Sequence, residues 1–156
     1  MSTRNAKKPR FLRANHADLE SVVPLIEAYY TLDEIPYDER SVRRGLQQLL
    51  GDSSLGAVWL IELEQSIAGY FVLTFGFDLE FGGRVGTITE LYLTPSARRR
   101  GLGTAALAFV EATLCDGGVH ALELQVEHDN IEALACYEKF GMTKHARVPM
   151  SKRLLK

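Results

Sequence analysis

Three consecutive arginines, Arg98 to Arg100, are followed by the tripeptide Gly-Leu-Gly, from Gly101 to Gly103. Glycine has no Cβ atom, so a ligand can approach its backbone N–H closely. The following residues have helical periodicity, and the first amides of a helix lack partners within it and carry partial positive charge. Permanent arginine charge beside such amides favours an anionic group. We therefore predict that this turn binds a phosphorylated ligand.

The turn differs from two familiar phosphate-binding loops. A Walker loop has Gly-Lys-Ser/Thr after a longer glycine spacing, and a Rossmann turn has a third glycine. Taken without its flanking residues, the turn has a second interpretation, a tight surface loop with solvated arginines. The surrounding sequence has to decide between these interpretations.

The composition is typical of one globular domain. The chain has 156 residues, of which 46% are hydrophobic and 24% charged, and single domains most often contain ~100–150 residues. We expect an N-terminal tail over residues 1–8 and a single domain over residues 9–156. The net charge is −2 and the basic residues gather in one turn, which argues against nucleic acid as a partner. No apolar run approaches the ~20 residues of a membrane span.

The N-terminal residues and the cysteines indicate a cytoplasmic protein. The basic N-terminus is not followed by an apolar stretch of the secretory type, so we expect no export. Cys115 and Cys136 lie in separate predicted helices without a Cys-x-x-Cys pattern, and we interpret both as reduced packing residues. We also expect no metal site, because the histidines are isolated.

Hydrophobic periodicity predicts an α/β domain in which three antiparallel strands lead into the arginine turn. Asp18 is expected to cap the first helix, Gly51 to end the second, and Asp129 with Glu132 to form a capping box. The strand after the third helix should run parallel to the strand before it. The expected elements, in order, are strand 11–14, helix 18–30, helix 39–50, strands 56–63, 67–77 and 85–93, helix 103–117, strand 121–127, helix 130–140 and strand 143–150.

Two segments of the chain resemble the signatures of the GNAT superfamily of N-acetyltransferases. The first runs from Glu90 through the turn to Thr104 and contains the acetyl-CoA signature Gln/Arg-x-x-Gly-x-Gly/Ala. The second begins at Asn130 and continues to Met142, where the family usually has phenylalanine. Their order and separation match the family. The resemblance implies a mixed α+β fold with a central, mostly antiparallel sheet of about six or seven strands, a splayed parallel pair and about four helices.

The resemblance also implies which residues bind the co-substrate acetyl-CoA. The backbone amides from Arg99 to Thr104 would hold the pyrophosphate, with Arg98 in the leading position of the motif. Backbone groups of the strand before the turn and the side chain of Asn130 would contact the pantetheine arm. The full expected set is Leu91, Tyr92, Leu93, Arg98, Arg99, Arg100, Gly101, Leu102, Gly103, Thr104, Asn130, Ala133 and Tyr137.

Tyr137 and Glu90 are the expected catalytic residues. A phenol with a pKa near ~10 is suited to protonate a leaving thiolate whose conjugate acid has a pKa near ~8.5. The other interpretation of Tyr137 is a tyrosine packed on a helix. Glu90 is the candidate base for the amine, with Glu127, His128 or water as alternatives. Strand alternation places Glu90 and Tyr92 on one face of the sheet.

The expected reaction is direct transfer of the acetyl group to a primary amine in a ternary complex. Carboxylates near the entrance would attract a cationic amine, although ordinary solvated loop charge is an equally good interpretation of them. Candidate acceptor-binding residues are Tyr29, Tyr30, Asp33, Glu34, Phe77 and Glu127. The alternatives are a non-catalytic CoA-binding sensor and an enzyme with a longer acyl donor. A homodimer is also compatible with the resemblance.

Overall fold

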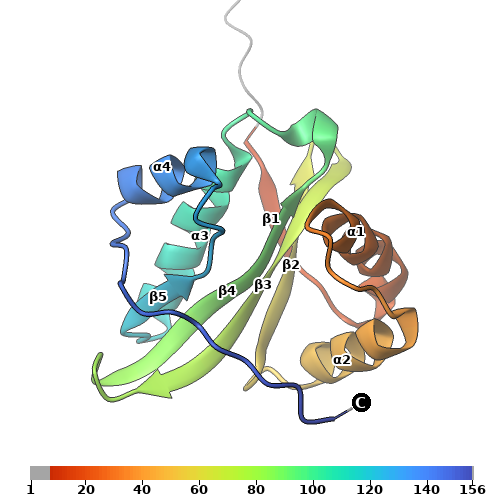
Figure 1. Cartoon of the computed structure of the whole chain (residues 1–156). Helices are drawn as coiled ribbons and strands as arrows, with labels where there is room; N and C mark the ends of the chain where they lie inside the picture. Colours follow the sequence, from red (N-terminus) through yellow and green to blue (C-terminus); the bar gives the residue numbers. More distant parts are fainter. Residues whose placement is uncertain (1–7, 156) are drawn as a thin grey trace, which may run out of the picture. The chain divides into compact units, whose positions relative to one another are not determined.

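The computed structural model describes residues 8–155, so most of the expected tail lies outside the described residues. The chain forms two compact units, Met1–Gln125 and Val126–Lys156, which we describe separately. The first unit contains a five-stranded sheet and three helices (Figure 1). Its elements are β1 (Arg10–Arg13), the 3-10 helix η1 (His16–Asp18), α1 (Leu19–Leu32), α2 (Glu39–Gly51), β2 (Gly56–Leu63), β3 (Ser66–Asp78), β4 (Gly83–Leu93), the 3-10 helix η2 (Pro95–Ala97), α3 (Leu102–Asp116) and β5 (Ala121–Leu124).

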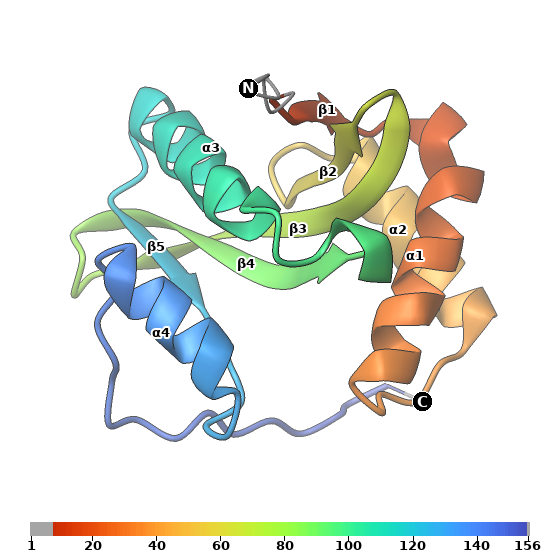
Figure 2. The same ribbon diagram turned by 90° about the horizontal axis from the view of Figure 1, so that it is seen from above.

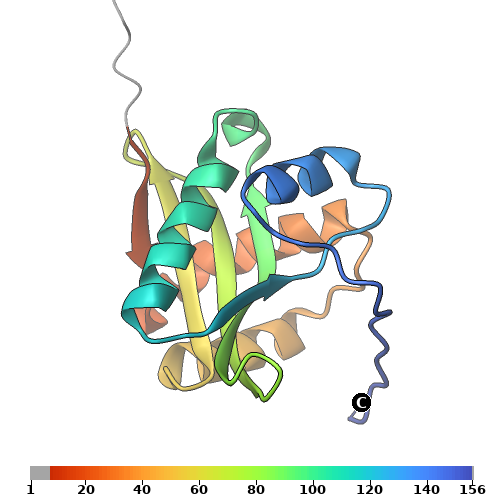
Figure 3. The ribbon, with the colours of Figure 1, turned by 90° about the vertical axis from the view of Figure 1, so that its left-hand side faces the viewer.

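The strands lie in the order β1-β2-β3-β4-β5, and only the β4–β5 pair is parallel. This confirms the predicted meander and the parallel crossover through α3. Figures 2 and 3 show α3 on one face of the sheet and α1 and α2 on the other. The mixed α+β architecture is therefore as expected, but the described residues form fewer strands than the six or seven predicted.

Each face of the sheet has its own apolar core. On the face of α1 and α2, helix residues such as Val22 and Ile26 pack with Val58, Tyr70 and Tyr92 from the strands. On the opposite face, aromatic rings join β1, β2 and β3 to α3. Phe109 of α3 lies 4.6 Å from Phe11 and 4.8 Å from Trp59, measured between ring centroids. These two cores hold the helices against the sheet and thereby position the site residues that the helices carry.

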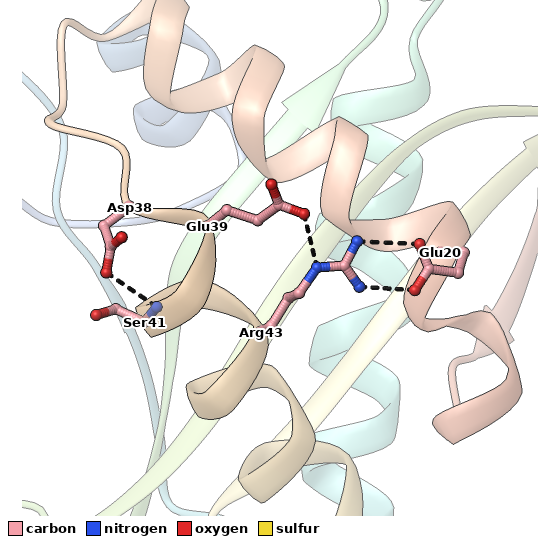
Figure 4. Close-up of polar contacts among 5 residues, drawn as sticks. All are labelled: Glu20, Asp38, Glu39, Ser41 and Arg43. Atoms are coloured by element: carbon pink, nitrogen blue, oxygen red, sulfur yellow. Dashed lines mark hydrogen bonds and ion pairs between the residues drawn. The ribbon is translucent and has the colours of Figure 1, made fainter.

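Arg43 joins α1 to α2 (Figure 4). Its guanidinium binds both carboxylate oxygens of Glu20 at 2.6 and 3.0 Å, and its Nε contacts Glu39 at 2.7 Å. Asp38 caps α2 by accepting a hydrogen bond from the Ser41 amide at 3.0 Å. The Arg43 network is exposed, so it stabilises the fold only weakly, but the bidentate geometry fixes the relative orientation of the two helices.

Two sequence expectations about helix starts are wrong, whereas α2 ends at Gly51 as expected. Asp18 does not cap α1 with its side chain; its carboxylate instead accepts from the Asn15 amide, and Asn15 caps η1. Asn130, not Asp129, caps the helix of the second unit. In both cases an asparagine side chain at another position accepts from an unpaired amide, and a cap is defined by that geometry.

Two predicted strands also differ from the structure. The strand expected at 121–127 ends at Leu124, and the segment from Thr143 to Met150 contains neither helix nor strand. Val148 and Met150 are 80% and 93% exposed. Strand-forming side chains make a strand only where a neighbour accepts and donates backbone hydrogen bonds, and Pro149 lacks a backbone donor. The expected packing role of Cys115 is wrong as well, because this residue is exposed.

The second unit consists of one helix and an irregular C-terminal segment. Helix α4 (Ile131–Lys139) begins after Asn130, whose Oδ1 accepts from the Ala133 amide at 3.1 Å. Gly141 follows the helix with a φ of 101°, a conformation that favours glycine. Lys144 pairs with Glu138 at 2.6 Å.

Candidate active site

A β-bulge determines which way Glu90 points. Val72 of β3 is opposite Glu90, whereas the next residue, Leu73, is opposite Ile88, so Thr89 is an extra residue in β4. Strict alternation through Thr89 would put Ile88 and Glu90 on one face. With the bulge, Ile88 pairs with Leu73. Glu90 pairs with Val72 and Tyr92 pairs with Tyr70, and the side chains of these residues lie on the face of the sheet that α1 covers. The bulge therefore places an ionisable side chain on the α1 face without burying it under α3.

The carboxylate of Glu90 accepts hydrogen bonds from two tyrosine hydroxyls. The Tyr70 hydroxyl donates to Oε2 at 2.7 Å, and the Tyr30 hydroxyl donates to Oε1 at 3.1 Å. Tyr70 comes from β3 and Tyr30 from α1, so the three groups meet from three separate elements. Two such bonds from separate elements fix the direction of the carboxylate.

The tyrosines around Glu90 remain protonated over a wide pH range. Burial, followed by the charge of Glu90, raises the pKa of Tyr30 to about 12. The same two causes raise the pKa of Tyr70 far above its ordinary value, and burial with the charge of Asp33 raises the pKa of Tyr29. A protonated phenol is a donor. At neutral pH, Tyr30 and Tyr70 therefore donate hydrogen bonds to Glu90.

The aromatic rings of the site support one another. Tyr29 contacts Tyr30 at 5.8 Å and Tyr92 at 6.4 Å, and Tyr70 contacts Tyr92 at 6.2 Å, all between ring centroids. Tyr70 and Tyr92 are directly opposite in the β3–β4 ladder. These edge and tilted contacts limit ring rotation, so the hydroxyls that face Glu90 are held by a packed aromatic cluster.

The arginine turn opens α3 in the predicted way. Gly101 has a φ of 78° and precedes the first helical residue. The first helical hydrogen bond runs from the Ala105 amide to the Gly101 carbonyl at 3.0 Å, so the amides of Leu102 and Gly103 have no acceptor within the helix. A Cβ atom on Gly101 or Gly103 would have no other heavy atom within 4 Å. The protein's own packing therefore does not require glycine at position 103.

The three arginines of the turn are placed differently. The Nε of Arg98 donates to the carbonyl of Leu93 at 3.0 Å, and its guanidinium lies 5.7 Å from the ring centroid of Tyr92. Arg99 has a φ of 58°. Arg100 lies 3.7 Å from Glu64 in an exposed ion pair, which water and salt weaken. Arg98 thus ties the turn back to β4, while Arg100 can exchange its partner for a phosphate.

Only part of β4 has a neighbour on its second side. The parallel pairing with β5 runs from Val85 to Ile88, and β5 ends at Leu124. Within residues 8–125, no strand pairs with the segment from Glu90 to Leu93 on that side. Backbone groups at such an edge need partners other than the sheet. This is the segment from which the resemblance expects contacts to the pantetheine arm.

Two predicted residues lie in the second unit. Asn130 uses its side-chain oxygen to cap α4. Tyr137 lies in the same helix, and its backbone carbonyl accepts from the Met142 amide at 3.0 Å. Burial raises the pKa of the Tyr137 hydroxyl, so this residue carries its proton at neutral pH. That protonation state is the one that a general acid requires.

The structure brings together some of the predicted acceptor residues. Tyr29 and Tyr30 contact each other, and Tyr30 contacts Glu90. Asp33 directly follows α1, and its charge affects Tyr29. Glu34 is exposed with a φ of 53°, and Phe77 is 69% exposed near the end of β3; no described contact joins either residue to Glu90. Glu127 belongs to the second unit.

Tyr70 was not among the residues predicted from the sequence. It is 0% exposed and would be interpreted as a core residue of a central strand. Its hydroxyl becomes informative only when the strand register and the bulge place Glu90 beside it. The sequence signal that could have pointed to Tyr70 is a tyrosine in a predicted central strand, because a buried tyrosine hydroxyl needs a hydrogen-bond partner.

Neither a metal site nor a membrane-spanning helix is found among the described residues. No group of three or more histidine, cysteine, aspartate or glutamate side chains is arranged to hold a metal ion in residues 8–155. Within the same part of the chain, every helix is too short or too polar to cross a lipid bilayer.

Comparisons with known proteins identify the family. Residues 19–142 match the model of the acetyltransferase (GNAT) family, so the chain belongs to that family. A mycothiol acetyltransferase from Amycolatopsis mediterranei (strain U-32) is 41% identical over 66 residues, which are 42% of this chain and 22% of the relative. The matched segment therefore spans about a fifth of that relative's length.

Solved structures share the fold over nearly the whole chain. An integron cassette protein from the mobile metagenome of Cole Harbour Salt Marsh has a TM-score of 0.82 and 31% identity, covering 94% of this chain and 91% of its own. An aminoglycoside N-acetyltransferase in complex with CoA has a TM-score of 0.80 and 15% identity, covering 98% and 99%. A Clostridium acetobutylicum structure described as a predicted acetyltransferase with acetyl-CoA has a TM-score of 0.77 and 18% identity, covering 93% and 96%.

Proposed function

We propose that this protein transfers the acetyl group of acetyl-CoA to a primary amine by direct attack in a ternary complex. The observation that carries the proposal is the turn at Gly101 to Gly103, where the amides of Leu102 and Gly103 have no acceptor within α3 and a Cβ atom on either glycine would meet nothing within 4 Å. A pyrophosphate supplies the negative charge and acceptor oxygens that such amides bind.

The co-substrate would lie along the turn and the exposed edge of β4. In this proposal the amides from Arg99 to Thr104 bind the pyrophosphate, and Arg100 reaches a second phosphate. Leu91 and Leu93 offer backbone groups to the pantetheine amides. The names of two structural neighbours support this choice, because one is a complex with CoA and another is a complex with acetyl-CoA.

The chemistry needs one base and one acid. An ammonium group has no lone pair, so the acceptor must first lose a proton, and Glu90 is the proposed group that receives it. The amine nitrogen then forms a bond to the thioester carbonyl carbon, and the bond from carbon to sulfur breaks. Tyr137 gives its proton to the leaving thiolate of CoA. No acyl-enzyme is needed, because neither cysteine has an evident activating base.

The acceptor is proposed to be a cationic amine. Tyr29, Tyr30 and Asp33 lie on or next to α1 near Glu90 and combine aromatic surface with negative charge, which attracts an ammonium group. Glu34, Phe77 and Glu127 complete the proposed acceptor set. One structural neighbour is named an aminoglycoside N-acetyltransferase, and aminoglycosides are therefore the first acceptor class to test.

The cellular setting is part of the same proposal. Neither Cys115 nor Cys136 forms a disulfide within residues 8–155, and Cys115 is exposed, which suits a reducing compartment such as the cytoplasm. β1 and β5 end the described sheet, and an edge strand can pair with a second copy. Light scattering of the purified protein would distinguish a dimer from a monomer.

The decisive experiment is a thiol-release assay with acetyl-CoA and a panel of amines. The panel should contain aminoglycosides, polyamines, amino acids and lysine peptides. Release of CoA thiol that depends on one amine class, with acetylated product found by mass spectrometry, supports the proposal. Calorimetric binding of CoA without thiol release for any amine would instead indicate a CoA-binding sensor. Release that is faster with propionyl- or succinyl-CoA would indicate a longer acyl donor.

A further inference from the structure

The proposed base is held by two hydroxyl groups from different elements. Glu90 is partly buried, and in the part of the chain that the structure describes no ion pair involves it. Its two carboxylate oxygens instead accept one hydrogen bond each, from Tyr70 and from Tyr30. We call these two residues the Glu90 tyrosine pair. Because the partners are neutral, the negative charge of the carboxylate is not cancelled by a neighbouring cation.

The two members of the pair differ in how firmly they are fixed. Tyr70 is 0% exposed in the central strand β3, and its hydroxyl lies 2.7 Å from Oε2. Tyr30 is partly exposed on α1, and its hydroxyl lies 3.1 Å from Oε1. The Tyr70 ring is buried in the core between the sheet and α1 and cannot leave without opening that core, whereas a ring on a helix surface can shift. Tyr70 is therefore the fixed donor.

Hydrogen bonds from both tyrosines leave the carboxylate able to accept further bonds. A carboxylate has about four acceptor positions on its two oxygens, and the tyrosine pair uses one on each. The remaining positions are directed by the orientation that the tyrosines impose. An amine can therefore meet a carboxylate whose direction is already set, which lowers the cost of ordering the base during the reaction.

We propose that Tyr70 is a positioning residue for the transfer reaction: its hydroxyl fixes the carboxylate of Glu90 toward the acceptor amine, and Tyr30 is the second, displaceable donor. This inference rests on the proposed role of Glu90 as the base. An incoming ammonium group takes the Oε1 position from Tyr30, while the bond from Tyr70 to Oε2 persists.

The roles of the two tyrosines predict different kinetic effects. Tyr70→Phe removes one oxygen atom and should lower kcat by about ten- to a hundredfold, the factor that a hydrogen bond to a charged group represents. The KM for acetyl-CoA should not change, because Tyr70 is not part of the proposed cofactor site. Tyr30→Phe should lower kcat by less than about tenfold, since its bond is broken when the amine binds.

Tyr37→Phe is the matched control. The Tyr37 ring packs against Tyr30 at 6.1 Å between centroids, and its buried hydroxyl has no hydrogen-bond partner among the described residues. It belongs to the same aromatic cluster but does not contact Glu90. Tyr37→Phe should leave kcat and the KM values for acetyl-CoA and the amine unchanged. If the removal of any tyrosine hydroxyl from this cluster lowered kcat, this variant would reveal it.

A double-mutant cycle separates positioning from a structural role. Tyr70→Phe, Glu90→Met and the double variant are compared, with circular dichroism confirming the fold. If Tyr70 acts through Glu90, its replacement causes no further loss of kcat in the Glu90→Met background. The same fractional loss in both backgrounds, or wild-type kcat in Tyr70→Phe, would overturn the inference.

Urea unfolding of the wild type and of these three variants gives a readout that does not depend on activity. Coupling between the two substitutions is expected because the groups are in contact, and its absence would overturn the inference even for variants too slow to assay. If wild-type protein binds CoA but acetylates no amine, the transfer reaction itself is refuted. If urea unfolding still shows coupling between the two substitutions in that case, Tyr70 and Glu90 form a purely structural pair, and the proposed positioning role is refuted.

Discussion

At the scale of single residues, Tyr137 and Glu90 each have surroundings that suit the role proposed for them. Tyr137 retains a proton because burial raises its pKa, so it can act as an acid. Glu90 is surrounded by protonated tyrosines that donate to it, so it is held as an acceptor. The two proposed roles therefore rest on different observations, the protonated state of Tyr137 and the hydrogen bonds that orient Glu90.

Replacing Glu90 by glutamine tests the base. The amide has the shape of the carboxylate but no basic lone pair of comparable strength, so kcat should fall by about a hundredfold or more. CoA binding by calorimetry should remain as in the wild type. Glu111→Gln, an exposed position on α3, is the control and should change neither quantity. Full activity of the Glu90 variant would transfer the role to Glu127, His128 or water.

Replacing Tyr137 by phenylalanine tests the acid. Removing the hydroxyl leaves the thiolate without its proton donor, and general acid catalysis typically contributes about a hundredfold or more. Steady-state thiol release should therefore slow by roughly that factor, while the Kd for CoA stays within about twofold, a change of less than ~0.5 kcal/mol. Unchanged turnover would mean that water protonates the thiolate and that Tyr137 only packs on its helix.

At the scale of elements, the first turn of α3 contains a glycine, Gly103, that the chain's own packing does not require. Glycine in a helix costs about 0.5–1 kcal/mol relative to alanine. Gly103 incurs that cost, although a Cβ there would meet no other heavy atom within 4 Å. Glycine at this position is therefore explained by something outside the chain's own packing, and the proposed pyrophosphate is such a group.

Gly103→Ala should therefore separate stability from binding. The free energy of unfolding should rise by about 0.5–1 kcal/mol, while CoA affinity falls because the new methyl group faces the phosphate. Gly45→Ala in α2, where a Cβ likewise meets nothing within 4 Å, should give the same stabilisation with unchanged affinity. Equal CoA affinity in both variants would contradict the placement of the pyrophosphate.

The tyrosine cluster that joins α1 to the sheet should make the protein sensitive to alkali. Because the folded-state pKa of Tyr30 is about 12 and an unfolded tyrosine has a pKa of about 10, the folded state binds more protons between these values. Stability is therefore complete below about pH 10 and declines as pH rises toward 12. Tyr29 and Tyr70, whose pKa values are also raised, extend the decline.

Thermal unfolding measured from pH 8 to pH 11 would show this decline as a falling Tm. Tyr30→Phe removes one of the groups, so its Tm should fall less steeply above pH 10 than that of the wild type. Absorbance of tyrosinate in the folded protein should appear later than in the urea-unfolded chain. A Tm that is constant to pH 11 would contradict the buried, protonated state of the cluster.

At the scale of the whole molecule, charge is distributed unevenly. The chain has a net charge of −2, yet Arg98, Arg99 and Arg100 are contiguous, and the proposed acceptor residues Asp33 and Glu34 lie at the other end of the first unit's sequence. In the proposed function, an anionic co-substrate would be attracted to the turn, while carboxylates would be available to a cationic acceptor. The two substrates would be separated by the sign of their charge.

The local charge predicts that salt weakens CoA binding. Exposed charges interact over a Debye length of about 10 Å at 0.1 M salt and about 3 Å at 1 M. The Kd for CoA, measured by calorimetry, should therefore rise several-fold over that range. Arg100→Ala should weaken binding at low salt and reduce the salt dependence, whereas Arg44→Ala on α2 should do neither. Affinity independent of salt would show that backbone amides alone hold the phosphates.

The sequence by itself predicted the family, most of the order of the elements and the glycine turn that precedes α3. These features depend on spacing along the chain. Gly101 and Gly103 must be close to Arg98 in the sequence to form one turn. The period of the hydrophobic residues likewise reflects the local geometry of a strand or a helix. The same locality explains the errors, because Asp18 and Asp129 were as plausible as caps as Asn15 and Asn130 when only composition was known.

Only the tertiary structure decided what surrounds Glu90. Tyr30 and Tyr70 are 60 and 20 residues away from it in the chain, and they meet it because of a register set by one extra residue, Thr89. The expected strand from Thr143 to Met150 failed for a related reason, since a strand needs a partner that its own sequence does not specify. Chain spacing fixes local turns, whereas contacts across a sheet depend on register, and register is a property of the folded whole.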